Sequence, residues 1–110
     1  DVDIEKLAEM LKALADPTRL KMLAILQHRD CCVCEFVPVF KISQPAVSKH
    51  LSRLKTAGLV KESRKGQWVF YSLNREVLEQ VGLALRQLPD MSDELKELEK
   101  QGLLVNVCCE

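Results

Sequence analysis

Residues 42–60 read ISQPAVSKHLSRLKTAGLV, and this stretch predicts the helix on which the fold depends. Ser43 suits the N-cap of a helix, Pro45 lies in its first turn, and Gly58 suits the C′ position just beyond its end. Apolar residues recur at i, i+4 and i+7 and predict one buried face: Val47, Leu51 and Leu54. The sequence therefore predicts a capped helix that turns its polar side chains to solvent.

A shorter helix is predicted just before it, over residues 33–40. Asp30 can cap the start of this helix, and Pro38 limits its length because a helix interior tolerates proline poorly. Only a few residues separate it from the helix that begins after Ser43. Two helices joined so closely are typical of a helix-turn-helix motif.

The rest of the chain adds more helices and one hairpin. Helical spacing predicts four further helices, over residues 3–15, 17–27, 75–88 and 92–101. In the second of these the predicted buried stripe is Leu20, Leu23, Ala24 and Leu26. Residues 59–73 change to period two, and Gly66 supplies a turn, which predicts a β-hairpin. The predicted fold class is mainly α with a small β-hairpin, as one winged helix-turn-helix domain over residues 1–110.

Charge is concentrated in one segment of a chain whose net charge is zero. Residues 41–65 carry seven lysines and arginines against a single acid, Glu62. Such a basic segment favours binding to a polyanion. Gln and Ser or Lys side chains on the outer helix face can contact bases, and the flanking basic residues can contact phosphates. The predicted DNA-binding residues are Gln44, Pro45, Ser48, Lys49, Ser52, Arg53, Lys55, Arg64 and Lys65.

Composition argues against two further classes of protein, membrane proteins and enzymes. No run of about 18 apolar residues is present, and the acidic N-terminal stretch does not resemble a signal peptide, which predicts a cytoplasmic protein with no membrane partner. An enzyme such as an arsenate reductase or thiol transferase would need an anion-cradling loop or a βαβ pattern around a nucleophilic cysteine. Neither is found, and four glycines leave little material for such a loop. We therefore predict that the chain is not an enzyme.

Five cysteines fall into two clusters, Cys31, Cys32 and Cys34 near the middle and Cys108 and Cys109 at the end. Structural disulfides are rare in a reducing compartment, so clustered thiols indicate metal or metalloid binding, or redox chemistry. On a regular helix, residues i and i+2 lie about 200° apart. Cys32 and Cys34 could then share an ion only if the helix start were distorted. A helix N-terminus is also expected to lower the pKa of these thiols.

Residues 14–26, residues 42–73 and the Cys32-Val33-Cys34 triplet resemble the ArsR/SmtB family of metal-responsive winged-helix repressors. The resemblance covers about residues 4–88. It implies a homodimer formed through the first helix and the helix at 75–88. It also implies binding to a palindromic double-stranded operator, with release when a metal binds.

The same resemblance identifies Cys32 and Cys34 as metal ligands and leaves the third ligand open. Arsenite-type relatives carry a further cysteine where this chain has Val37, so the candidates are Cys31, Cys108 and Cys109. Residues 75–100 lack the histidine of the zinc-type site, and no cysteine precedes residue 31. These features favour trivalent arsenic or antimony as inducer, with no cofactor in the DNA-bound state. Two alternatives remain open, a cadmium- or lead-responsive repressor and a thiol-redox sensor that forms a disulfide or polysulfide.

Overall fold

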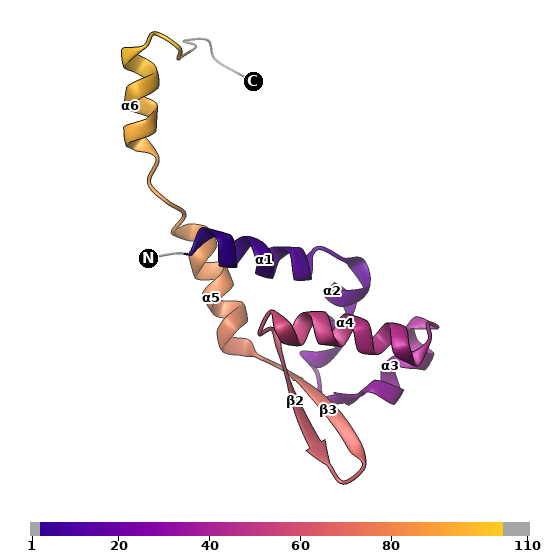
Figure 1. Ribbon diagram of the computed structural model, residues 1–110. Coiled ribbons are helices and arrows are strands. Elements are labelled where there is room, and N and C mark those ends of the chain that lie inside the picture. Colours follow the sequence, from indigo (N-terminus) through magenta and orange to yellow (C-terminus); the bar gives the residue numbers. More distant parts are fainter. Residues whose placement is uncertain (1–2, 105–110) are drawn as a thin grey trace.

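The computed structural model describes residues 3–104, which form helices and short strands in the order α1, α2, β1, α3, α4, β2, β3, α5, α6 (Figure 1). Their bounds are α1 Ile4–Leu14, α2 Pro17–Leu26, β1 Cys31–Cys32, α3 Val33–Phe40, α4 Gln44–Thr56, β2 Val60–Lys65, β3 Trp68–Leu73, α5 Arg75–Arg86 and α6 Ser92–Lys100. The predicted helix-turn-helix and hairpin are both confirmed. No helix within residues 3–104 has the length and apolar character needed to cross a membrane.

Local capping sets the start of α4 as predicted, whereas the predicted cap of α3, Asp30, is wrong because Cys32 is the N-cap residue of that helix. The Ser43 side chain accepts a hydrogen bond from the Ala46 N–H at 3.2 Å, and Asp16 accepts one from the Arg19 N–H at 3.0 Å. Gly58 follows α4 with a φ of 79°, a left-handed conformation that glycine adopts without strain. Side-chain caps satisfy amide groups that the first helical turn cannot pair internally.

The sheet has one strand more than the sequence predicted. Its order is β1-β3-β2, and both pairings are antiparallel. β2 and β3 form the predicted hairpin, which extends away from the helices (Figure 1). β1 consists of Cys31 and Cys32, which lie opposite Tyr71 and Phe70 of β3. A two-residue strand is too short to carry a periodic signal, so only its partner defines it.

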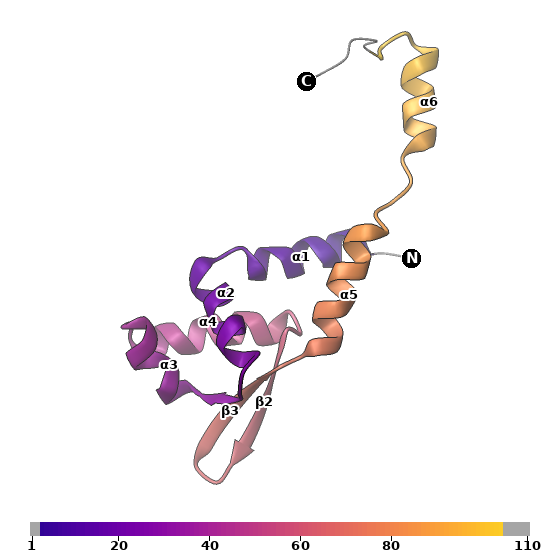
Figure 2. The same cartoon turned by 180° about the vertical axis from the view of Figure 1, so that it is seen from behind.

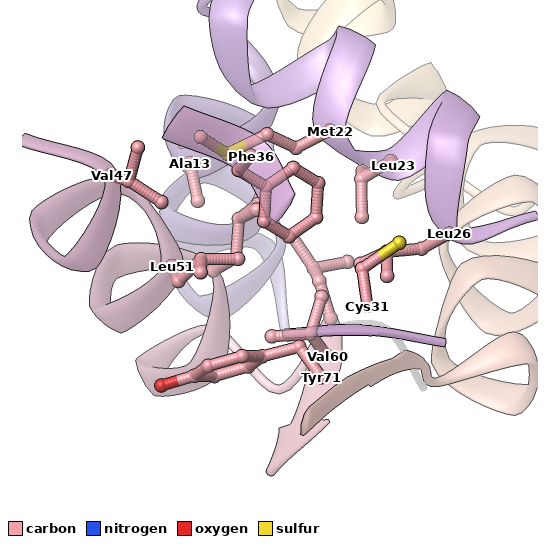
Figure 3. Packing of buried hydrophobic residues seen from close by; sticks show 12 residues of the cluster. Ala13, Met22, Leu23, Leu26, Cys31, Phe36, Val47, Leu51, Val60 and Tyr71 are labelled. Atoms are coloured by element: carbon pink, nitrogen blue, oxygen red, sulfur yellow. The ribbon is translucent and has the colours of Figure 1, made fainter. Parts of the chain in front are cut away.

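The core lies between α2, α3, α4 and the base of the sheet (Figure 3). The predicted inward face of α4 is confirmed, since its three apolar residues have no exposed surface: Val47, Leu51 and Leu54. The prediction for α2 is partly wrong. α2 buries Met22, Leu23 and Leu26 against α4 and β3, which leaves Leu20 52% exposed and Ala24 facing solvent.

α1, α5 and α6 present apolar side chains outward. α5 lies next to the N-terminal part of α1, and α6 stands apart from the other elements (Figures 1 and 2). Exposed large apolar residues on these helices, and on the segment between α5 and α6, are Ile4, Leu83, Leu85, Leu88, Met91, Leu95 and Leu98. An apolar surface of this extent is typical of a surface that a partner covers.

Candidate thiol site and nucleic-acid interface

Two thiols meet at the start of α3. Cys32 is the N-cap residue, with extended backbone at φ −83° and ψ 153°, and Cys34 lies in the first helical turn. Their Sγ atoms are 2.9 Å apart. The prediction that these sulfurs lie on opposite sides of a regular helix is wrong, because Cys32 precedes the helix. The pair can therefore approach one ion without unwinding a turn.

Glu35, the residue after Cys34, stabilises the start of α3 through two contacts. Its Oε1 accepts a hydrogen bond from the Cys32 N–H at 2.7 Å, and its Oε2 lies 3.4 Å from Nη2 of Arg29. Sequence reasoning did not select Glu35. The available signal was its position three residues after an N-cap, which is the capping-box spacing.

The environment keeps two of the thiols protonated. The hydrogen bond to Cys32 is the main cause that raises the pKa of Cys34, and burial and the Glu35 charge add to it. Burial raises the pKa of the Cys31 thiol, and the Glu35 charge acts in the same direction. For Cys34, the expected lowering of the thiol pKa by the helix N-terminus is wrong. A divalent ion such as cadmium or lead that binds here must displace the thiol protons, so its binding should strengthen as pH rises.

The structure does not bring Cys31 into the pair. Cys31 is 4% exposed, and its Sγ atom points toward Leu23 and Leu26 of α2 (Figure 3). Its thiol donates a weak hydrogen bond to the Arg29 carbonyl at 3.7 Å. Residues 3–104 contain no cluster of three or more His, Cys, Asp or Glu residues placed to hold a metal ion. Cys108 and Cys109, the other candidate ligands, lie outside the described residues.

The candidate nucleic-acid interface combines the outer face of α4 with the hairpin. All nine predicted DNA-binding residues are exposed: Gln44, Pro45, Ser48, Lys49, Ser52, Arg53, Lys55, Arg64 and Lys65. Lys65 lies over the Phe70 ring at 5.5 Å from its centroid. Lys55 is already paired, since its Nζ lies 3.0 Å from Glu62 Oε1. A phosphate would have to compete with Glu62 for Lys55.

A polar contact ties α4 to the turn between α1 and α2. Arg19 bonds Nδ1 of His50 at 3.1 Å and donates through Nε to the Ala13 carbonyl at 2.6 Å. Because arginine can only donate, Nδ1 of His50 is the acceptor in this contact. His50 is thus partly buried against α2, whereas His28 is exposed in the turn after α2.

Tyr71 and Glu62 form a further pair that sequence reasoning missed. The Tyr71 hydroxyl donates to Glu62 Oε2 at 2.6 Å, and the ring is 7% exposed. Burial, with help from the Glu62 carboxylate, raises the pKa of Tyr71 to about 12. The hydrogen bonds from Tyr71 and Lys55 lower the pKa of Glu62.

This pair predicts a loss of stability at high pH. An unfolded tyrosine ionises near pH 10, whereas the folded chain keeps the Tyr71 proton until about pH 12. The free energy of unfolding should therefore fall as pH rises through this window, by roughly 1 kcal/mol for each pH unit. Tyr71→Phe should lack this component, so urea denaturation of both proteins at about pH 9 and 11 should give a larger fall for the wild type. Equal falls would show that Tyr71 ionises normally.

The sequence is similar to known bacterial regulatory proteins. Residues 16–62 match the family described as "Bacterial regulatory protein, arsR family". The chain is 42% identical over 86 residues to the arsenic resistance transcriptional regulator ArsR1 of Pseudomonas putida, covering 77% of this chain and 67% of that protein. It is 34% identical over 110 residues to ArsR2 of the same organism, covering 92% and 96%.

Among solved structures, the fold is similar to a homodimeric winged helix-turn-helix DNA-binding domain from Mycobacterium bovis. The TM-score is 0.66 at 25% identity, over 77% of this chain and 84% of that chain. That domain is described as a possible ArsR-family transcriptional regulator.

Proposed function

The chain belongs to the arsR family of bacterial regulatory proteins, and from that premise we propose that it is a repressor released from its operator by trivalent arsenic or antimony. The resemblance seen in the sequence is thereby confirmed. The chain is a DNA-binding transcriptional regulator and not an enzyme. The names of the two Pseudomonas putida relatives support arsenic as the inducer.

The observation that carries this proposal is the Sγ–Sγ distance of 2.9 Å between Cys32 and Cys34. Soft thiolates select soft ions, and two converging sulfurs supply two ligands of a three-thiolate site. Each arsenic–sulfur bond replaces one arsenic–hydroxide bond, and the thiol proton leaves with the hydroxide as water. Cys31, Cys108 and Cys109 remain the candidates for the third ligand.

The position of the pair explains how binding would reach the DNA. α3 begins at Val33 and ends at Phe40, and only residues 41–43 separate it from α4. An ion that pulls on Cys32 acts on the N-terminus of α3, where the Cys32 N–H bonds Glu35. A shift of this short helix is passed to α4 because the connection between them is tight.

We further propose a homodimer formed through α1 and α5 that reads a palindromic operator. The exposed apolar residues of α1 and α5 support it, namely Ile4, Leu83 and Leu85, together with Leu88 just beyond α5. The homodimeric Mycobacterium bovis domain supports it too. A two-fold dimer presents two copies of α4, and a palindrome offers two matching half-sites.

The test is a titration of the chain on its own upstream DNA, followed by fluorescence anisotropy. Arsenite and antimonite should dissociate the complex at lower concentration than cadmium, lead or zinc. Release by cadmium or lead alone would favour the divalent-ion alternative.

The thiol-redox alternative is favoured by the same short sulfur distance. Hydrogen peroxide would oxidise the two thiols to one disulfide and be reduced to two waters. Mass spectrometry of Cys32 and Cys34 after arsenite or peroxide treatment, matched to DNA release, separates the two chemistries.

The hairpin tip should contribute phosphate contacts. Replacing Arg64 and Lys65 by glutamine should weaken operator binding about tenfold and reduce the slope of log affinity against log salt by about 2, because two phosphate contacts are lost. Lys96→Gln, on exposed α6, is the matched control and should leave the slope unchanged. An unchanged slope in the hairpin variant would place the tip away from the phosphates.

A further inference from the structure

A polar side-chain bridge joins the last turn of α4 to both strands of the hairpin. Glu62 of β2 uses both carboxylate oxygens, one toward Lys55 Nζ at 3.0 Å and the other toward the Tyr71 hydroxyl at 2.6 Å. Glu62 and Tyr71 are direct partners in the strand register. Since Tyr71 is 7% exposed, one end of the bridge is fixed in the protein interior.

The buried end of the bridge lies beside the thiol segment. Tyr71 pairs with Cys31 across the ladder between β1 and β3, and Cys32 pairs with Phe70. Cys32 is therefore both a candidate ligand and a residue of the sheet. A displacement of Cys32 acts on β3 directly, and through Tyr71 and Glu62 it reaches Lys55 at the C-terminal end of α4.

A purely structural role does not explain why an acidic residue occupies position 62. It is the single acid among residues 41–65, on the surface predicted to bind a polyanion. A carboxylate here repels phosphates and occupies Lys55, so it costs affinity for DNA. Its hydrogen bonds to Lys55 of α4 and Tyr71 of β3 suggest a role in connecting these two elements.

We propose that Glu62 and Tyr71 are positioning residues that couple the thiol site to the C-terminal end of α4. The inference rests on the proposed function, and it adds a second connection to the one through α3. α4 is then held at both ends by elements that contact the thiol segment. Binding at Cys32 and Cys34 shifts β1, and the bridge passes this shift to the helix that reads DNA.

The experiment measures coupling as the ratio of operator affinities without and with arsenite. Tyr71→Phe removes only the hydroxyl, and Glu62→Gln removes only the charge. Each should reduce the ratio about threefold to tenfold, which lies within the roughly twofold to thirtyfold range by which residues between two coupled sites alter coupling. Glu62→Gln should also strengthen operator binding without arsenite, whereas loss of a purely structural contact would weaken it.

Ser72→Ala is the matched control. Ser72 neighbours Tyr71 in β3 and lies opposite Lys61, and within residues 3–104 its hydroxyl makes no hydrogen bond. This variant should keep the wild-type ratio. If Tyr71→Phe and Glu62→Gln keep it as well, the bridge does not carry coupling.

A second measurement reads the connection between the two sites without arsenite, because operator DNA that shifts α4 should also shift the thiol segment through the bridge. Operator DNA should change the rate at which iodoacetamide alkylates Cys34 in the wild type, and Tyr71→Phe should diminish that change. An equal change in both proteins, or none in the wild type, overturns the inference. If alkylation is coupled but arsenite does not release the wild type, the proposed inducer alone is wrong.

Discussion

Replacing both Cys32 and Cys34 by serine should abolish arsenite-induced release of the operator. The hydroxyl group keeps nearly the size of a thiol but is a poor ligand for a soft ion. Coupling between two sites commonly changes affinity 5- to 150-fold, so we expect arsenite to weaken wild-type operator binding within that range. The double variant should change by less than about twofold. Anisotropy titrations with and without arsenite give both values.

The double variant should still fold and bind the operator when arsenite is absent. Cys32 occupies the N-cap of α3, where serine is a preferred residue, and Cys34 is exposed. Replacing Cys108 and Cys109 by serine is the matched control, since it removes two thiols from outside the described residues. If that variant loses the response as well, the tail supplies the third ligand. A double variant at positions 32 and 34 that still responds would place the site elsewhere.

Elements encoded by neighbouring residues were predicted well. Ser43 and Gly58 mark the two ends of α4, and the apolar spacing between them identifies its buried face. The capping residues and the apolar spacing both depend on residues close together in the sequence, so tertiary contacts do not override them. β1 shows the opposite case. Its residues Cys31 and Cys32 pair with Tyr71 and Phe70, 40 and 38 positions further along the chain, and no local sequence pattern predicts that pairing.

The candidate site likewise has features that the local sequence predicts and features that depend on contacts between elements. The exposure of the α4 residues followed from the helical period, whereas the meeting of Cys32 and Cys34 depended on where α3 begins. With Asp30 as the cap, Cys32 would lie inside the helix, whereas the observed N-cap is Cys32 itself, and its extended backbone lets the two sulfurs meet. The bridge through Glu62 depends on strand register, which fixes the partner of every residue along β2 and β3. Contacts between separate elements therefore needed the structure.

Leu51→Ala should destabilise the protein by about 2–5 kcal/mol, the usual cost of removing a large buried aliphatic side chain. Leu51 lies at the centre of the inward face of α4, has no exposed surface and belongs to the core cluster that includes Phe36 and Met22. Alanine favours the helix, so the loss comes from the lost burial and the cavity and not from helix propensity. Urea unfolding followed by circular dichroism, at one fixed protein concentration, measures the change.

Ser52→Ala is the control at the neighbouring position of the same helix. Ser52 is exposed, so its replacement should change the free energy of unfolding by less than about 0.5 kcal/mol. The two variants should also separate stability from DNA reading. Leu51→Ala at a temperature where it remains folded should bind the operator nearly as the wild type does, whereas Ser52→Ala should weaken binding without loss of stability. A small stability cost for Leu51→Ala would mean that α4 does not pack on the core through this face, and the assignment of its outer face to DNA would fail with it.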